Sequence, residues 1–114
     1  MVKNTYIPSR GDIVWVDFNP QRGHEQAGRR PALTVSPKMY NARAGLALMC
    51  PITSKVKNYP FEVSVQQNNI QGAVLVDQIQ SLDWHERNTR FIDKIDPFLL
   101  EQIQQKLLSL LTEG

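Results

Sequence analysis

The stretch from Gly23 to Pro31 brings together side chains that could do acid–base and phosphate chemistry. It holds the imidazole of His24, the carboxylate of Glu25 and the guanidiniums of Arg29 and Arg30. A carboxylate or an imidazole can take a proton from a hydroxyl, and a guanidinium can hold the charge that develops on phosphorus. The stretch therefore predicts chemistry at a phosphate. The alternative is a polar hairpin connection whose charges are merely solvated.

Length and composition are those of one small globular domain. The chain has 114 residues, of which 41% are hydrophobic and 21% charged, which suits a single core. No apolar run approaches the roughly 18 residues needed to span a bilayer, and the N-terminus lacks the apolar core of a secretory signal. These features predict a cytoplasmic protein that does not bind membranes.

The cysteine and histidine content bears on redox state and on metals. The single cysteine, Cys50, excludes a disulfide within the chain and fits a reducing cytoplasm. Two histidines and one cysteine are too few for a usual zinc site. Any catalysis is therefore expected to need no metal ion and no cofactor.

The net charge of +2 conceals an uneven distribution of charge. Residues 1–58 hold nine Lys or Arg against three Asp or Glu, whereas residues 59–114 hold four against eight. This separation predicts a basic surface, and a basic surface attracts a polyanion such as RNA. An acidic partner protein would suit the same surface.

The elements that must position the loop are mostly strands. Alternating and short apolar runs predict strands at residues 12–18, 31–36, 46–52, 61–65, 73–79 and 91–95. A short helix is expected at residues 37–43, ended by Gly45, and Gly72 is expected to open the strand that follows it.

The end of the chain changes to helical periodicity. Asp96 is a good N-cap and Pro97 suits the first helical position. The apolar residues that follow form a helical stripe about 15 residues long, made of Leu99, Leu100, Ile103, Leu107, Leu110 and Leu111. Short strands and one covering helix predict a small, strongly bent sheet or partial barrel.

Several motifs, in this order, resemble those of MazF/PemK-type toxins. They are RGDIVWVDFNP at 10–20, GHEQAGRRPA at 23–32, Ser36-Pro37 with Tyr40-Asn41, CPITS at 50–54, YPFEV at 59–63 and GAVLVDQI at 72–79. The resemblance covers about residues 6 to 96 and is closest to the MazF branch.

That resemblance implies one SH3-like barrel domain over residues 1–114, of about five to seven strands and of the CcdB/PemK type, that forms a homodimer. It implies a sequence-specific, metal-independent endoribonuclease toxin that cuts single-stranded messenger RNA and arrests translation and growth. The 2′-hydroxyl would attack the adjacent phosphate to leave a 2′,3′-cyclic phosphate and a 5′-hydroxyl. A cognate antitoxin would place an acidic, flexible segment in the RNA groove.

Three residues match the catalytic positions of the family. Glu25 would be the general base for the 2′-hydroxyl, Arg30 would stabilise the transition state, and Thr53 would hydrogen-bond the scissile phosphate. The alternative for Arg30 is a structural ion pair with Asp12 or Asp17, and Thr53 could equally be an ordinary threonine at a strand end.

Two further residues are candidates for catalysis or RNA contact. Some relatives use a histidine at the position of His24 as a catalytic acid or base, whereas others have serine there. His24 is therefore expected to contact RNA or to assist the proton transfers, without being obligatory. In one branch of the family an aspartate at the place of Asp77 works with an arginine two residues earlier, where this chain has Leu75. That departure favours Glu25 with Arg30 and leaves Asp77 open to a second interpretation, a buried carboxylate that organises a loop.

The expected RNA-positioning residues are polar or basic. They are Gln26, Arg29, Asn41, Lys55, Lys57 and Gln78. Lysines give affinity and salt sensitivity, and the amide of Gln78 could read a base because it both donates and accepts. Trp15 and Trp84 are expected to serve packing or dimer contacts, and Cys50 to be a buried, inert thiol.

Two functions of other classes share this fold. The implied fold also resembles that of CcdB-type toxins, which bind DNA gyrase and hydrolyse nothing. Those toxins depend on a C-terminal Trp-Gly-Ile, whereas this chain ends in Leu111-Thr112-Glu113-Gly114. A catalytically inactive SH3-like module that binds a protein segment is the other alternative. The joint presence of Glu25, Arg30 and Thr53 counts against both.

Overall fold

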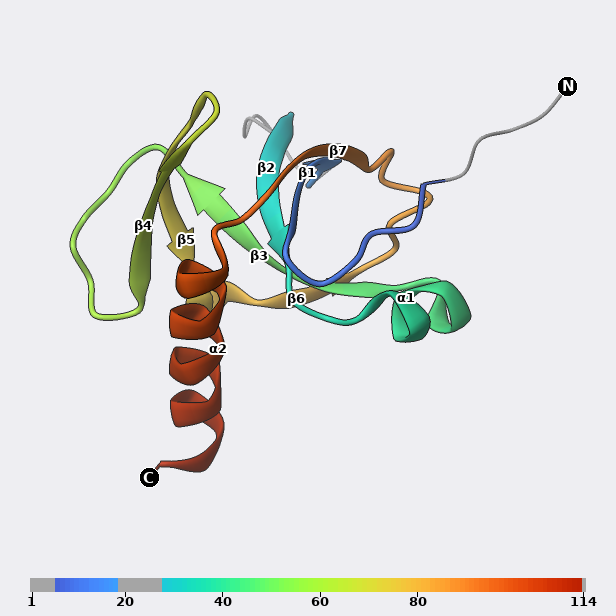
Figure 1. Cartoon of the computed structure of the whole chain (residues 1–114). Helices are drawn as coiled ribbons and strands as arrows, with labels where there is room; N and C mark the ends of the chain where they lie inside the picture. The colour runs from blue at the N-terminus through green and yellow to red at the C-terminus, as the bar shows by residue number, and fades with distance from the viewer. Residues whose placement is uncertain (1–5, 19–27, 114) are drawn as a thin grey trace, which may run out of the picture.

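The computed structural model describes residues 6–18 and 28–113, and Figure 1 shows their arrangement. The elements in that part of the chain are β1 (Asp12–Asp17), β2 (Arg29–Thr34), α1 (Lys38–Ala44), β3 (Ala47–Thr53), β4 (Glu62–Gln67), β5 (Ile70–Leu75), the 3-10 helix η1 (Val76–Gln78), β6 (Gln80–Leu82), β7 (Arg90–Lys94) and α2 (Pro97–Thr112). None of these helices is long and apolar enough to cross a membrane.

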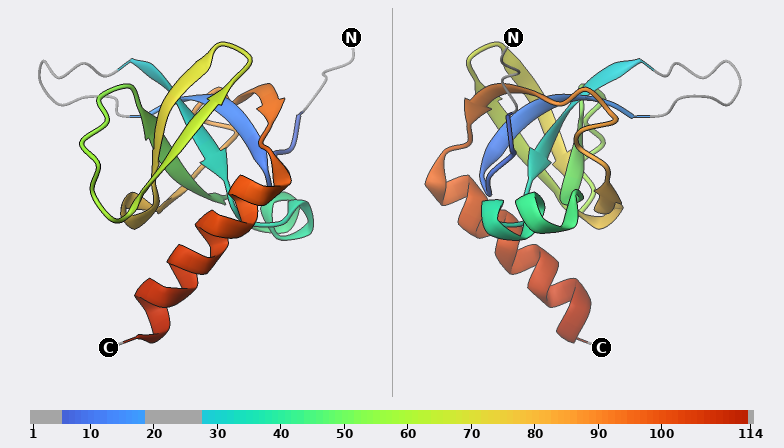
Figure 2. Two further views of the ribbon diagram at one scale, coloured as in Figure 1. Left: turned by 60° about the vertical axis from the view of Figure 1, so that its left-hand side comes forward. Right: turned by 90° about the vertical axis from the view of Figure 1, so that its right-hand side faces the viewer.

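The strands form one curled antiparallel sheet in the order β4-β5-β3-β2-β1-β7, with β6 paired to β3 (Figure 2). Strand β3 joins the two halves of this sheet. Ala47 to Pro51 pair with β6 and β2, whereas Ile52 and Thr53 pair with Val74 and Ala73 of β5. The mainly β fold with a bent sheet and a C-terminal helix, predicted from the sequence, is confirmed.

Alternation along the central strands builds two cores. Successive strand residues face opposite sides of a sheet, so Ile13 packs with Leu33 and Ile103 in one core. Its neighbour Val14 packs with Met49 in the other. The buried indole of Trp84 belongs to the second core, as expected for a packing residue. Strand β1 is therefore held on both faces.

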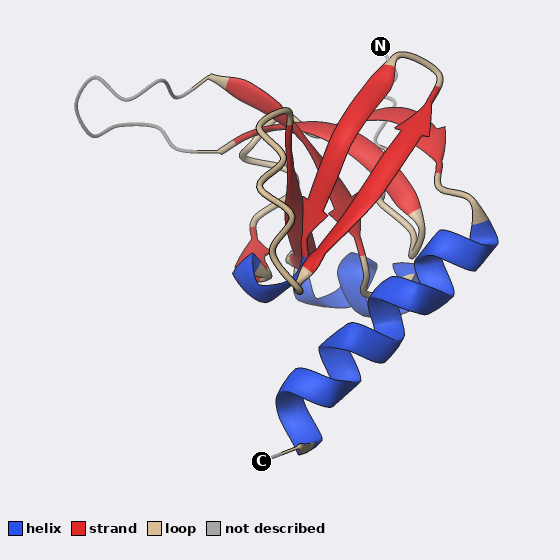
Figure 3. Ribbon diagram, turned by 90° about the vertical axis from the view of Figure 1, so that its left-hand side faces the viewer, coloured by secondary structure: helices blue, strands red, loops and turns tan. Residues whose placement is uncertain are grey.

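Helix α2 begins as the sequence predicts. The carboxylate of Asp96 accepts a hydrogen bond of 2.9 Å from the backbone N–H of Phe98, and Pro97 takes the first position. The helix packs through Ile103, but its C-terminal end points away from the sheet and Leu111 is 81% exposed (Figure 3). Only the first part of the stripe therefore covers the sheet.

The expected strand at residues 73–79 is wrong at both ends. Strand β5 begins earlier, at Ile70, because Asn68 and Asn69 form a two-residue turn with positive φ angles of 38° and 70°. It ends at Leu75, where the chain turns into η1. The short strand β6 was not expected, because three residues are too few for a period to show.

The expectation that Asn41 contacts RNA is also wrong, because this residue is fully buried. Its side-chain amide donates to the carbonyl oxygens of Pro8, at 2.8 Å, and Ser36, at 3.0 Å. The Ser36 hydroxyl donates to its Oδ1, and Trp84 Nε1 donates to its backbone oxygen at 2.9 Å. Every polar atom of this side chain is bonded within the protein, so Asn41 ties α1 to the second core.

Gly72 allows β5 to pass directly against the end of β3. A Cβ atom built on Gly72 would lie 2.1 Å from the carbonyl oxygen of Thr53 and 3.3 Å from Cα of Ser54. Both are backbone atoms, so no side chain could move aside. By contrast, a Cβ on Gly28 would meet nothing within 4 Å.

We predict that Gly72→Ala destabilises the fold by about 1–3 kcal/mol, as overpacking in a closed site does. Urea unfolding at fixed pH measures this, with Gly28→Ala as the matched control for the backbone-entropy effect of the same substitution. If Gly72→Ala unfolds with the same free energy as Gly28→Ala, then β3 and β5 can move apart to admit the methyl group without loss of stability, and the prediction is wrong.

Candidate active site

Arg30 and Thr53 lie where two neighbouring strands part. The hydrogen-bonded ladder between β2 and β3 ends at Ala32 and Pro51, although β2 extends back to Arg29 and β3 on to Thr53. Beyond Pro51, strand β3 turns to pair with β5. Arg30 and Thr53 line one groove at this place.

An open groove of about 380 Å³ lies at this place. Its walls come from segments far apart in the sequence: Trp15, Arg30, Pro31, Ile52, Thr53, Ser54, Lys55, Asn69, Ile70 and Gln71. The fold thus brings together three of the expected site residues, Arg30, Thr53 and Lys55. Trp15, Ser54, Asn69 and Gln71 were not expected there.

The hydroxyl of Thr53 is held in a defined orientation. Its Oγ1 accepts a hydrogen bond of 3.0 Å from the backbone N–H of Lys55. Within residues 6–18 and 28–113 no group accepts a hydrogen bond from this hydroxyl, so its proton can be donated to a ligand in the groove. Thr53 can therefore donate to a phosphate oxygen.

Arg30 does not form the structural ion pair with Asp12 or Asp17 that was the alternative to a catalytic role. Asp17 pairs with Arg29 at 2.8 Å, and the buried Asp12 pairs with Lys94 at 2.6 Å. Among the described residues Arg30 forms no ion pair, so none of these carboxylates compensates its charge at the groove.

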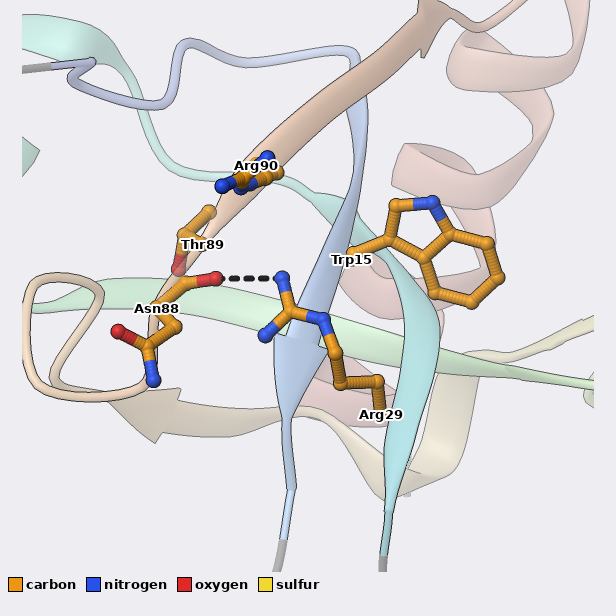
Figure 4. Close-up of a pocket in the computed structure, with 5 residues that line it drawn as sticks. All are labelled: Trp15, Arg29, Asn88, Thr89 and Arg90. Carbon is orange, nitrogen blue, oxygen red and sulfur yellow. Dashed lines mark hydrogen bonds between the residues drawn. The ribbon is translucent and has the colours of Figure 1, made fainter.

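Arg29, the neighbour of Arg30 on β2, lies in a second groove of about 660 Å³, where its guanidinium points toward Asn88 (Figure 4). That groove is lined by Trp15, Arg29, Asn88, Thr89 and Arg90. Arg29 donates to a carboxylate oxygen of Asp17 at 2.8 Å and to the carbonyl oxygen of Asn88 at 2.6 Å. Trp15, 40% exposed, lines both grooves and separates them.

The carboxylate of Asp17 organises this second groove. The side-chain amide of Asn88 donates to it at 2.9 Å, and the charge of Arg29 lies beside it. The hydrogen bond from Asn88, followed by that from Arg29, lowers the pKa of Asp17 below its usual value. Arg29 is therefore neutralised locally, in contrast to Arg30.

Other predicted residues lie away from the groove or outside the described part of the chain. Asp77 and Gln78 are exposed on η1 and line none of these grooves, so the interpretation of Asp77 as a buried carboxylate is wrong. Lys57 is exposed in the loop before β4, with its Nζ 6.0 Å from the ring centre of Tyr59. His24, Glu25 and Gln26 lie outside the described residues.

Cys50 is buried in β3. Burial, with the charge of Asp77 as the smaller cause, raises the pKa of the Cys50 thiol to about 12, so it is the inert thiol that the sequence predicts. Within residues 6–18 and 28–113, no three His, Cys, Asp or Glu side chains gather closely enough to hold a metal ion.

Comparison with known proteins gives consistent matches over almost the whole chain. Residues 9–111 match the family model described as PemK-like, MazF-like toxin of type II toxin–antitoxin systems. The chain is 42% identical over 102 residues to the endoribonuclease toxin MazF of Escherichia coli K12, covering 90% of this chain and 92% of that protein. It is 38% identical over 93 residues to the endoribonuclease toxin ChpB of the same strain, covering 76% and 78%.

Solved structures agree with these matches. A MazE–MazF crystal structure from Deinococcus radiodurans superposes with a TM-score of 0.88 at 44% identity, over 96% of this chain and all of the matched chain. MazF alone from the same organism gives a TM-score of 0.85 at 45% identity, over 94% and 98% of the two chains.

We predict that Asp17→Asn flattens the acid limb of the stability curve. Because the folded-state pKa of Asp17 lies below its unfolded value, its stabilisation is present above about pH 4 and lost as pH falls through the folded-state pKa. Thermal midpoints between pH 2.5 and 7 measure this, and the partial exposure of the group makes the effect small. The exposed Asp77→Asn is the matched control; parallel curves for the two variants would contradict the prediction.

Proposed function

The chain belongs to the PemK-like, MazF-like toxin family of type II toxin–antitoxin systems, and on this premise we propose that it cuts single-stranded RNA without a metal ion in the groove that contains Arg30 and Thr53. Its matched relatives are named endoribonucleases, so the chain is an endoribonuclease toxin. Neither the gyrase poison nor the inactive binding module receives comparable support.

In the proposed reaction Glu25 takes the proton of a ribose 2′-hydroxyl. The 2′-oxygen then bonds to the adjacent phosphorus while the bond from phosphorus to the 5′-oxygen breaks. The protonated Glu25 passes its proton to the leaving 5′-oxygen and returns to the carboxylate. The products are a 2′,3′-cyclic phosphate and a 5′-hydroxyl. The role of Glu25 rests on its position in the family motif, five residues before Arg30, and His24 is proposed to assist the proton transfers or to contact the RNA.

The observation that carries the proposal is the convergence at one groove of a lysine, an oriented hydroxyl and a guanidinium that forms no ion pair with residues 6–18 or 28–113. Arg30 would hold the negative charge that increases on the phosphate oxygens, because its charge is uncompensated among the described residues. Thr53 would donate its free proton to one of those oxygens. Lys55 would attract the RNA backbone.

The flanking surface would extend the RNA site. Lys57, in the loop after Lys55, and Gln26, near Glu25 in the sequence, are proposed to contact RNA. Arg29 and the exposed Arg90 line the neighbouring groove across Trp15, and this groove would hold RNA beyond the scissile phosphate.

The proposed partners follow from the same surface. Related crystal structures from Deinococcus radiodurans are MazE–MazF complexes, and we propose that a cognate antitoxin places an acidic, flexible segment over these grooves and blocks RNA by charge complementarity. We also propose that the toxin works in the cytoplasm as a homodimer and arrests growth by cutting messenger RNA faster than it is replaced.

We predict that Glu25→Ala or Arg30→Ala reduces RNA cleavage by about 10²-fold or more, the usual cost of removing a general base or a charge-stabilising donor. Arg30→Lys should recover only part of the rate, since an ammonium lacks the planar fork. Arg43→Ala, an exposed arginine on α1, is the matched control and should cut at the wild-type rate.

The assay uses a long mixed-sequence RNA in EDTA, with sequencing of the new 5′ ends. Discrete cuts at a shared short motif that carry 5′-hydroxyls, absent from the Glu25→Ala sample, are the expected result. Wild-type cutting by both Glu25→Ala and Arg30→Ala would refute the site, and loss of activity in EDTA would refute metal independence.

We predict that replacing Lys55 and Lys57 together by Ala weakens RNA binding and lowers its salt dependence without moving the cut sites. For each phosphate that a lysine no longer neutralises, the slope of log affinity against log salt should fall by about 0.7. Titration of a non-cleavable RNA at several salt concentrations measures the slope, and the exposed Lys38→Ala on α1 is the control. An unchanged slope would place the RNA backbone elsewhere.

A further inference from the structure

A second hollow of about 510 Å³ adjoins the groove with Arg30 and Thr53. This hollow is lined by Ser54, Val56, Ser64, Val65, Gln66, Gln71 and Gly72. Ser54 and Gln71 line both spaces, so the two are neighbours. Because Ser54 directly follows Thr53 in the chain, the hollow lies next to the proposed phosphate site.

The chemistry of this hollow differs from that of the groove beside it. No charged side chain is among its lining residues. Apolar surface from Val56 and the bare backbone of Gly72 lie beside two hydroxyls, from Ser54 and Ser64, and the amides of Gln66 and Gln71. The side chain of Val65 is buried in the first core, so only its backbone borders the hollow. This mixture suits a flat, uncharged ligand with donors and acceptors at its edge.

The two amides lie side by side on the β4–β5 hairpin. Gln66 and Gln71 are direct cross-strand partners, so their side chains share one face of the hairpin. No side chain or backbone group of the described residues hydrogen-bonds either amide. Both amides are free to bind a ligand.

The adjoining amides, by contrast, fasten the hairpin in place. Gln67 donates to Asp93 at 2.7 Å and to the carbonyl oxygen of Lys94 at 2.8 Å, and it accepts from the backbone N–H of Asp96 at 3.1 Å. Asn68 donates to the same carboxylate of Asp93 at 2.5 Å. The hairpin tip is thereby tied to β7 and to the start of α2, which holds Gln66 and Gln71 in fixed positions.

We infer that this hollow binds a nucleobase next to the scissile phosphate, and that Gln66 and Gln71 read its edge. The inference rests on the proposed ribonuclease function. An amide both donates and accepts, as the edge of a base requires, and unstacked bases of single-stranded RNA expose such edges. An acidic antitoxin segment would gain little from an uncharged pocket, so the hollow favours RNA.

The test compares wild type with Gln66→Ala, Gln71→Ala and the double variant on an RNA pool randomised around a known cut site. At one position of the motif, preference for the favoured base should fall about tenfold or more, while preferences at the other positions stay unchanged. Gln102→Ala, an exposed amide on α2, is the matched control and should keep the full preference.

Two outcomes would overturn the inference. One is an unchanged motif and unchanged rates in the double variant. The other is an equal loss of cutting at every sequence by variants that retain the wild-type melting temperature. If an alanine variant fails to fold, Gln71→Glu keeps the shape but removes the donor, and it should change the preferred base at the same single position; an unaltered preference would count against the inference.

A binding assay separates failure of the pocket from failure of the proposed function. Short RNAs with a 2′-deoxy ribose at the cut site cannot be cleaved and differ only at the base in question. Wild type should bind the favoured base about tenfold more tightly, and the double variant should bind all four equally. If wild type binds with this preference but no RNA is ever cut, the catalytic proposal fails and the base pocket stands; equal binding by wild type refutes the pocket.

Discussion

The close approach of β5 to the end of β3 is the constraint on which the site depends. It is made possible by the missing Cβ of Gly72, which leaves room for the carbonyl oxygen of Thr53. Because β3 also pairs with β2 and β6, this contact joins the two halves of the curled sheet. Thr53 and Ser54, which lie at this contact, line the groove that contains Arg30, and Ser54 also lines the hollow beside it. One packing contact thus positions both the groove and the hollow.

The different surroundings of Arg29 and Arg30 follow from strand geometry. Adjacent residues of β2 face opposite sides of the sheet, and Arg29 lies across from Asp17 in the register. Asp17 and Asn88 hold Arg29 in place and balance its charge. Arg30, one residue further on, meets no carboxylate among the described residues and keeps its charge for a ligand.

Local patterns predicted much of this protein. Alternation located β1 and β7 to within one or two residues, and the Asp96–Pro97 pair predicted the start of α2, because caps and periodicity depend on residues close in sequence. The same reasoning misplaced Asn41 and missed Gln71. Asn41 is buried through its hydrogen bonds with Pro8 and Trp84, and Gln71 is placed by the pairing of β5 with β3. These contacts join residues far apart in the chain, so no pattern in the nearby sequence predicts them.

The sequence by itself determined the family, the fold class and the types of residue available for catalysis, because the motifs are contiguous and the functional groups of the side chains can be read directly from the residues. Tertiary structure alone decided which polar residues share a surface. Asn41 is buried in the core, and Asp77 and Gln78 lie on the separate 3-10 helix η1. Trp15, Asn69 and Gln71, by contrast, line the groove. The physical reason is that strand pairing joins residues distant in the chain, and its register decides which face each side chain occupies.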